Sequence, residues 1–284
     1  MATSNAPLSI DHIALTVRDL DTVGDFYERV IGLEKIAGDG ESRLLGEGDR
    51  PLIELRRDAQ ARSLPFEAGL FHTAFLLPHR DDLGRWLRHF GEAGGRLEGA
   101  SDHLVSEAVY LRDPEGNGIE IYADRPRTDW TFEGQMIVMD TLRLDVQSLL
   151  QAPGRWSGAP DGTVIGHVHL QVGDLAAAEA FYAGELGFDL VSELPAARFF
   201  STGGYHHHIG TNVWNSRGAG RRSPDAAGLS ELALAATPEA AARLGAKTVT
   251  DPSFTAPSFT DRSFTDPWGN RIAIHPRPAN AAAA

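Results

Sequence analysis

The chain has 284 residues, a formal net charge of −13 and no cysteine, and its 42% hydrophobic and 23% charged residues are ordinary for a soluble protein. This length suffices for two domains that each bury a core. The absence of cysteine excludes disulfides, thiolate metal sites and cysteine nucleophiles, so any metal must be held by His, Asp, Glu or water.

The charge and the apolar runs also restrict the partners. An acidic chain is unsuited to nucleic acid, whose phosphates need a basic surface. No apolar run reaches the length of a membrane span, and the N-terminus lacks a signal-peptide pattern. We therefore expect no nucleic acid and no membrane among the partners, and a cytoplasmic location.

The first elements in chain order are a strand and an amphipathic helix. Residues 10–17 alternate as a strand, and apolar residues then recur at helical spacing between Asp19, a suitable N-cap, and Gly32, which ends the helix. Short strands follow, including PLIELRR from Pro51. This order is the β-α-β-β-β pattern of one module.

A second module of the same kind follows. GLFHTAFLLP from Gly69 is typical of a first strand, and the next helix has apolar residues from Leu83 to Phe90. DPEGNGIEIY from Asp113 then predicts a tight turn and a closing strand, because Asp-Pro opens a turn and the glycines allow positive φ.

The second half of the chain repeats the first. IDHIALTVRDLDTVGDFYERVIGL from Ile10 matches IGHVHLQVGDLAAAEAFYAGELGF from Ile165, and DPEGNGIEIY matches DPWGNRIAIH from Asp266. Repetition at this scale indicates a duplication. The sequence therefore predicts four βαβββ modules and an α+β fold, in which paired modules form two open barrel-like domains.

We place the domain boundaries where the repeat begins and ends. The first domain is expected at residues 7–126 and the second at 163–277, joined by a linker over 127–162 with a short helix near 139–150. The C-terminal residues 278–284 are expected to be a disordered tail.

Three metal-binding side chains fall at matching positions in the first two modules. His12 and His72 lie on first strands, and Glu120 lies on a closing strand. If the two modules pair into a barrel, these residues can face one cavity. Two imidazoles and one carboxylate suit Fe(II), and also Mn(II) or other divalent ions. Each His alone could be a hydrogen-bonded strand residue, but a carboxylate in an apolar strand is costly without a cation.

Several stretches carry a resemblance to a known family: GLFHTAFLLP, SDHLVSEAVYLRDPEGNGIEIYADRP, GHVHLQV and GGYHHHIGTNVW. With them the chain resembles the vicinal oxygen chelate (glyoxalase/bleomycin resistance/dioxygenase) superfamily over nearly its whole length. Within that superfamily it is most similar to the two-domain type I extradiol catechol 2,3-dioxygenases. The motifs are specific for the superfamily and less so for the reaction.

The resemblance implies an enzyme that opens a catechol-like aromatic diol with O2 at a two-His, one-carboxylate site. It maps the iron ligands onto His12, His72 and Glu120, and it maps the catalytic second-sphere His and Tyr onto His103 and Tyr110. We expect Fe(II) as the metal, with Mn(II), Ni(II), Co(II) or Zn(II) as alternatives. The expected partners are the diol and O2, in a homo-oligomer.

Two features depart from the family pattern. The family's active iron site lies in the C-terminal half, whereas the complete triad lies here in the N-terminal half. The family also has an acid/base His on the closing strand of the preceding module, where RPLIELRRD offers only Glu54. Glyoxalase I-like relatives place a fourth ligand at this position.

Glu54 leaves other functions open. A set of His12, Glu54, His72 and Glu120 would suit Ni(II), Co(II) or Zn(II) and a lyase or isomerase reaction, although Glu54 could equally be a surface residue. A further alternative is a metal-free binding protein similar to the bleomycin-resistance branch.

The second half lacks an equivalent triad of its own. Glu231 stands where His72 would be and Ala273 where Glu120 would be, so we expect catalysis in the N-terminal half and a milder effect from His167→Ala than from Glu120→Ala. The second half is nevertheless rich in histidine, which indicates either a hydrogen-bonded polar cluster or a second metal site. The five residues are His167, His169, His206, His207 and His208.

Overall fold

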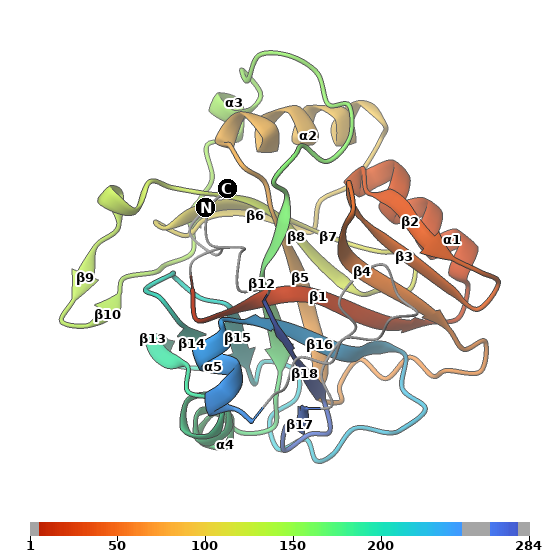
Figure 1. The fold of residues 1–284 in the computed structure, drawn as a ribbon. Coiled ribbons are helices and arrows are strands. Elements are labelled where there is room, and N and C mark those ends of the chain that lie inside the picture. Colours follow the sequence, from red (N-terminus) through yellow and green to blue (C-terminus); the bar gives the residue numbers. More distant parts are fainter. Residues whose placement is uncertain (1–5, 246–261, 278–284) are drawn as a thin grey trace.

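The computed structural model describes residues 6–245 and 262–277 and folds into two large curved sheets with helices on their outer sides (Figure 1). The first module begins as predicted. The Asp19 side chain accepts a hydrogen bond from the Thr22 backbone N at 3.0 Å, and Gly32 ends the helix with φ of +83°. Its elements are β1 (Leu8–Val17), α1 (Leu20–Phe26), the π-helical turn η1 (Tyr27–Ile31), β2 (Glu34–Gly38), β3 (Ser42–Glu47) and β4 (Arg50–Arg57).

The second module also follows the pattern. Asp113 holds the turn before its closing strand, because one carboxylate oxygen accepts from the backbone N of Glu115 and of Asn117, each at 2.9 Å. The elements are β5 (Gly69–Leu76), α2 (Arg80–Glu92), β6 (Gly99–Asp102), β7 (Ser106–Arg112) and β8 (Gly118–Asp124).

The segment between the halves holds only short elements, and the single turn α3 falls within the range expected for a helix. These elements are η2 (Arg127–Asp129), β9 (Phe132–Glu133), β10 (Met136–Ile137), β11 (Leu142–Arg143) and α3 (Val146–Leu149).

The second half repeats the module plan. The third module comprises β12 (Val164–Gln171), α4 (Leu175–Glu179), η3 (Ala180–Glu185), β13 (Asp189–Leu194), β14 (Ala197–Ser201) and β15 (Ile209–Asn212). The fourth comprises β16 (Gly228–Ala236), α5 (Pro238–Arg243), β17 (Ser263–Thr265) and β18 (Arg271–Pro276). The tail predicted at 278–284 lies outside the described residues.

The modules pair across the two halves of the chain. One sheet, called the outer sheet below, has the order β17-β18-β16-β1-β4-β3-β2, so it joins the first module to the fourth. The other, called the inner sheet, has the order β11-β6-β7-β8-β5-β12-β15-β14-β13, so it joins the second module to the third. The α+β class and the two open barrel-like sheets are as expected. The division into residues 7–126 and 163–277, however, separates strands that the structure pairs.

Two antiparallel strand pairs make these junctions. β1 pairs with β16, and β5 pairs with β12, and Figure 1 shows each pair side by side near the middle of the molecule. Each sheet therefore contains first strands from both halves of the chain. The cavity-facing residues of the second module must meet those of the third module, not those of the first.

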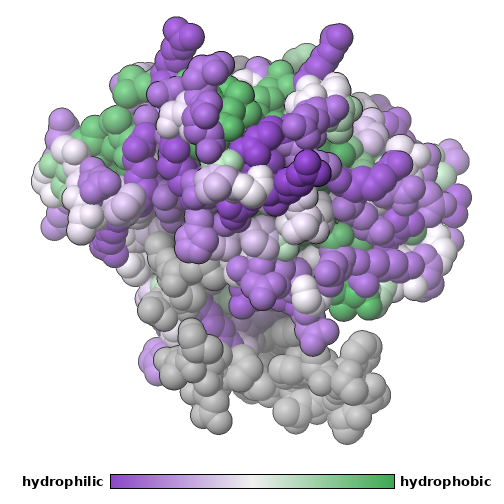
Figure 2. All heavy atoms as spheres, turned by 90° about the horizontal axis from the view of Figure 1, so that it is seen from above, coloured by the Kyte–Doolittle hydropathy of each residue, from purple (hydrophilic) through white to green (hydrophobic). Residues whose placement is uncertain are grey.

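The helices cover the sheets with amphipathic faces. In α2, Leu83, Trp86 and Leu87 are buried, and the Trp86 indole donates to the Val30 carbonyl at 2.8 Å. Figure 2 shows the molecule from the side of α2 and α3, where most described residues are hydrophilic and the apolar ones form scattered groups. Of the helices in the described part of the chain, none is long and apolar enough to cross a membrane.

The pairing across halves gives a first prediction. Residues 1–126 produced alone would leave β1 and β5 without their partners β16 and β12, and would expose the apolar faces that these strands bury. We expect this fragment to be unfolded or aggregated, and to fold when it is co-produced with residues 127–284. A dispersed NMR spectrum from the isolated fragment would contradict the pairing.

Candidate metal centre

Strand register aligns three positions on one face of the inner sheet. In the ladder, Ala74 on β5 lies opposite Glu120 on β8 and also opposite His167 on β12. His72 precedes Ala74 by two residues, so its side chain points to the same face. The small Ala74 side chain leaves room above it, and the three larger side chains converge there from three neighbouring strands.

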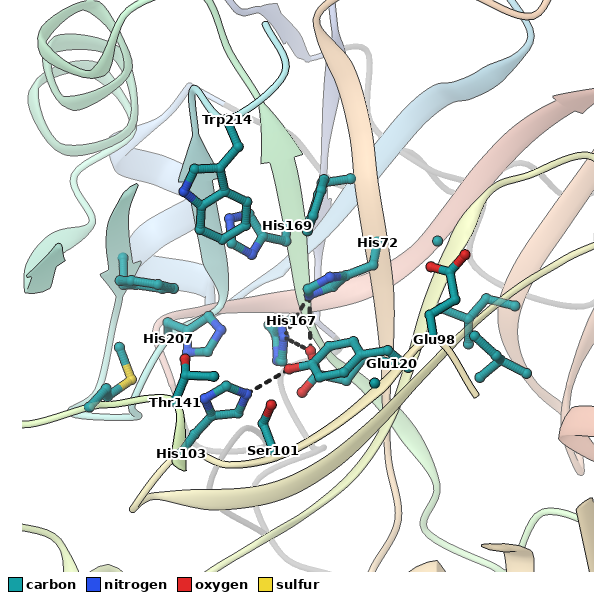
Figure 3. Close-up of a pocket in the computed structure, with 18 of the residues that line it drawn as sticks. His72, Glu98, Ser101, His103, Glu120, Thr141, His167, His169, His207 and Trp214 are labelled. Atoms are coloured by element: carbon teal, nitrogen blue, oxygen red, sulfur yellow. Dashed lines mark hydrogen bonds and ion pairs between the residues drawn. The ribbon is translucent and has the colours of Figure 1, made fainter. Parts of the chain in front are cut away.

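The three side chains meet at their tips (Figure 3). Glu120 Oε2 lies 3.0 Å from His72 Nε2 and 3.2 Å from His167 Nε2, and the two imidazole nitrogens are 3.4 Å apart. All three side chains are at most 7% exposed. Atoms held about 2.1 Å from one ion at right angles lie about 3.0 Å apart. The donor set and its spacing therefore fit one divalent metal bound on one face.

The protonation states also suit a metal. Burial by itself would raise the pKa of Glu120, but His167 and His72 outweigh it and hold this pKa well below its ordinary 4.5. Burial lowers the pKa of His167 to about 4, although Glu120 opposes the shift. At neutral pH the group is thus a carboxylate beside a neutral imidazole, which is the state that metal ligation requires.

The predicted residues His103 and Tyr110 lie beside this group. His103 Nδ1 is 2.8 Å from the Asp140 carbonyl, which can only accept, so Nδ1 carries the proton. His103 Nε2 then accepts from the Tyr110 hydroxyl at 2.6 Å. Burial and the nearby Glu120 raise the pKa of Tyr110 well above 10, so the phenol stays protonated. The Tyr110 ring contacts the His72 ring at 5.6 Å.

The structure does not bring His12 to His72 and Glu120. His12 lies on β1 in the outer sheet, where Asp11 Oδ2 accepts from its Nδ1 at 3.1 Å and from His275 Nδ1 at 2.8 Å. These two imidazoles outweigh the effect of burial and hold the pKa of Asp11 far below 3.8. The structure groups His167, and not His12, with His72 and Glu120, because the first two modules do not share a sheet as the prediction assumed.

The register shows what His12 corresponds to. His12 lies opposite Ala233, which lies opposite Ala273, in the same way that His167, Ala74 and Glu120 line up in the inner sheet. His12 is thus the counterpart of His167. The outer sheet therefore has Ala273 at the position where the inner sheet has Glu120.

Glu54 likewise does not lie with His72 and Glu120. It lies on β4 in the outer sheet, and its carboxylate binds Arg56 at 2.6 Å. Glu231, in the same sheet, binds Arg271 at 2.6 Å. Both carboxylates are therefore taken up by ion pairs, and the four-ligand set of His12, Glu54, His72 and Glu120 does not form.

The five clustered histidines of the second half surround the inner group, of which His167 is a member. His169 packs against the His72 ring at 4.9 Å, and His207 packs against the His167 ring at 4.0 Å. Burial, and then the neighbouring imidazoles, lower the pKa of His207 well below 6.5, so the ring is neutral. His208 binds Ser201 through Nδ1 at 3.1 Å.

His207 is a residue that the sequence did not single out as part of the site. It lies in YHHH, directly before β15, the closing strand of the third module, and this is the module that the structure pairs with the Glu120-bearing second module.

A cavity of about 320 Å³ opens in front of the group. Its walls combine the polar side chains described above with apolar and aromatic ones, and Phe71 packs edge-to-face against Trp214 at 5.1 Å. An apolar cavity of about 150 Å³ suffices for benzene, so a substituted ring can enter here. The apolar and aromatic lining residues are Phe71, Leu111, Ile119, Met139, Leu194, Phe199 and Trp214.

Comparison with known proteins agrees with this geometry. The family model described as the Glyoxalase/Bleomycin resistance protein/Dioxygenase superfamily matches residues 9–121 and 164–274. The chain belongs to this superfamily. It is 44% identical over 228 residues to Catechol-2,3-dioxygenase from Bacillus subtilis (strain 168), which covers 78% of this chain and 80% of the relative. The expectation of a dioxygenase-like enzyme with a metal cofactor is supported accordingly.

Solved structures show the same fold at low identity. Glyoxalase I from Zea mays superposes with a TM-score of 0.55 at 17% identity, over 95% of this chain and 92% of that chain. A mutant of the same enzyme gives a TM-score of 0.57 at 16% identity, over 96% of this chain and 95% of that chain. At this identity the likeness concerns the fold alone.

The buried histidines give a second prediction. Burial holds the pKa of His208 at about 3, below its ordinary 6.5, so the unfolded chain binds more protons than the folded one as pH falls from 6.5 toward 3. At pH 5 this difference costs about 2 kcal/mol of stability. His208→Asn keeps an acceptor near Nδ1 and cannot titrate.

We therefore expect the metal-free His208→Asn protein to lose less stability than the wild type between pH 7.5 and pH 5. Urea unfolding at both values measures the two losses. Equal losses in the two proteins would show that His208 is not held neutral.

Proposed function

We propose that this protein is a metal-dependent extradiol dioxygenase that cleaves a catechol-like aromatic diol with O2. The ligands in this proposal are His72, Glu120 and His167. The observation that carries it is the convergence of their three ligand atoms, 3.0–3.4 Å apart, at the base of a cavity large enough for an aromatic ring.

Fe(II) is the metal we favour. Two imidazoles and one carboxylate on one face form the triad of non-haem iron oxygenases, although Mn(II) and other divalent ions accept the same donors. When bound, the metal would supply Lewis acidity and a template for the diol and O2.

Tyr110 and His103 act as a pair in this proposal. The His103 ring is fixed by the Asp140 carbonyl, so it holds the Tyr110 hydroxyl in one orientation. Tyr110 can then bind a substrate oxygen near His72, and His103 can receive or return a proton through this hydroxyl. Both roles require close approach, and the two residues line the cavity.

His207 is the base that we assign to the substrate hydroxyl. Its ring lies against His167 and lines the cavity, and it is neutral, so it can accept a proton from a diol bound there. Ring opening adds both atoms of O2 to the product and breaks the bond between a hydroxylated carbon and its unsubstituted neighbour. The hydroxyl must lose its proton before that step.

The alternatives have less support. The hypothesis of a glyoxalase I-like lyase or isomerase requires Glu54 as a fourth metal ligand. Glu54 lies in the outer sheet and binds Arg56 instead. Metal-free sequestration of a ligand would give no role to the buried Glu120 carboxylate, which faces two imidazoles. Dependence on O2 separates cleavage from isomerisation, and metal analysis separates both from sequestration.

The third prediction is the activity itself. Protein loaded with Fe(II) under anaerobic conditions should consume O2 and form a yellow ring-opened product when a catechol panel and air are added. The Glu120→Ala variant should be inactive, because its loss removes the only anionic ligand of the set. Absence of product with every diol tested, from protein with stoichiometric iron, would refute the proposal.

The fourth prediction compares two equivalent histidines. His167→Ala should lower retained metal at least tenfold and abolish turnover, whereas His12→Ala should change neither by more than about twofold. This reverses the expectation from sequence that His167→Ala would be mild. Metal content measured after gel filtration shows which of the two histidines holds the metal. Loss of metal from His12→Ala with retention in His167→Ala would restore the first assignment.

A further inference from the structure

A chain of hydrogen bonds leads from the cavity to the end of β8. The His207 Nδ1 atom lies 2.8 Å from His206 Nδ1, and His206 Nε2 lies 2.8 Å from Asp124 Oδ1. The same Asp124 oxygen accepts from the Tyr205 hydroxyl at 3.0 Å. The His206 side chain is fully buried, whereas Asp124 is 19% exposed. The chain thus connects the cavity with the outside of the sheet.

The positions of the protons follow from the acceptor at the end of this chain. The Asp124 carboxylate can only accept, so His206 Nε2 carries a proton. In a neutral imidazole the other nitrogen is then an acceptor, so His206 Nδ1 accepts and His207 Nδ1 donates. The Nε2 atom of His207 therefore carries no proton. This is the nitrogen available to a ligand in the cavity.

A base at this position meets an electrostatic difficulty. The His207 and His167 ring centres are 4.0 Å apart, so a proton that stayed on His207 would place a cation beside a ligand of the metal. Such a cation and the divalent metal that His167 would hold carry like charges, which repel each other in a buried site. His207 therefore works best as a base if the positive charge that it gains can move to another residue.

We propose that Asp124, His206 and His207 form a proton relay that carries charge away from the metal centre. This rests on the proposed function, because the proton donor is the diol hydroxyl. The substrate O–H bond breaks as an Nε2–H bond forms on His207, and the Nδ1 proton of His207 passes to His206 Nδ1. The positive charge then rests on His206, which is paired with Asp124. The reverse transfer returns the proton.

Asp124 and His206 are positioning residues in this scheme, and the tautomer of His207 is their signature. In protein with 15N-labelled histidine and its metal removed, wild-type His207 should carry its proton on Nδ1. Asp124→Asn should lose this single tautomer, because an amide can donate to His206 as well as accept. Tyr205→Phe is the matched control, since it removes the other partner of Asp124 and should leave the tautomer unchanged. The His207 signal is assigned by its absence in His207→Asn.

Kinetics supply a second readout. Asp124→Asn should lower kcat about 10–100-fold, with metal content and the KM for the diol within about twofold of wild type. Asp124→Glu should recover part of the loss, and Tyr205→Phe should stay within about threefold. If Asp124→Asn does not fold, His206→Phe, which keeps a ring and removes both nitrogens, replaces it in both measurements.

Three results would overturn the relay. The first is a wild-type His207 protonated on Nε2, and the second is an equal loss of kcat in Asp124→Asn and Tyr205→Phe. The third is a fall in metal content or a rise in KM that accounts for the loss. If the wild type cleaves no diol, the proposed function fails, and the tautomer measurement still decides the direction of the relay.

Discussion

The antiparallel pairing of β5 with β12 is the constraint on which the candidate metal centre depends. It places Ala74 between Glu120 and His167, so that two side chains from different halves of the chain reach over one small residue. Ala74 is fully buried. A larger side chain at this position would fill the space that the ligands need. A slip of one residue in this register would turn His167 to the opposite face of the sheet.

Electrostatics add a second constraint to this geometry. A buried carboxylate costs free energy unless a positive partner compensates it. Here its closest partners are imidazoles, and burial keeps His167 neutral at pH 7. The fold therefore holds one carboxylate beside two imidazoles in a buried site, with its proton already lost at neutral pH. A divalent cation can take these donors without first displacing a proton, and its charge adds to the compensation that the imidazoles give.

Most of the fold could be predicted from the sequence, because its signals are local. The alternation in β1, the Asp19 cap and the Asp113 turn depend on neighbouring residues, and the internal repeat can be read directly by comparing the two halves of the sequence. The choice of partner for each module does not depend on neighbouring residues. The first strands of all four modules are similar, and nothing within GLFHTAFLLP specifies whether β5 pairs with β1 or with β12. His72 and Glu120 come from one module, so they could be placed together. The third member of the group depends on the pairing, so the sequence points to His12 where the structure places its counterpart His167.

The order of the modules also has a consequence for how the chain can fold. The inner sheet uses strands between residues 69 and 212, whereas the outer sheet joins β1 to β16, whose residues lie more than 200 positions apart in the register of Leu8 with Ala236. Closing so long a loop costs conformational entropy, and contacts of large sequence separation form slowly. On a ribosome the inner sheet can be complete while β1 has paired only with β4 and still lacks β16. The candidate metal centre would thus be assembled before the first module joins the fourth.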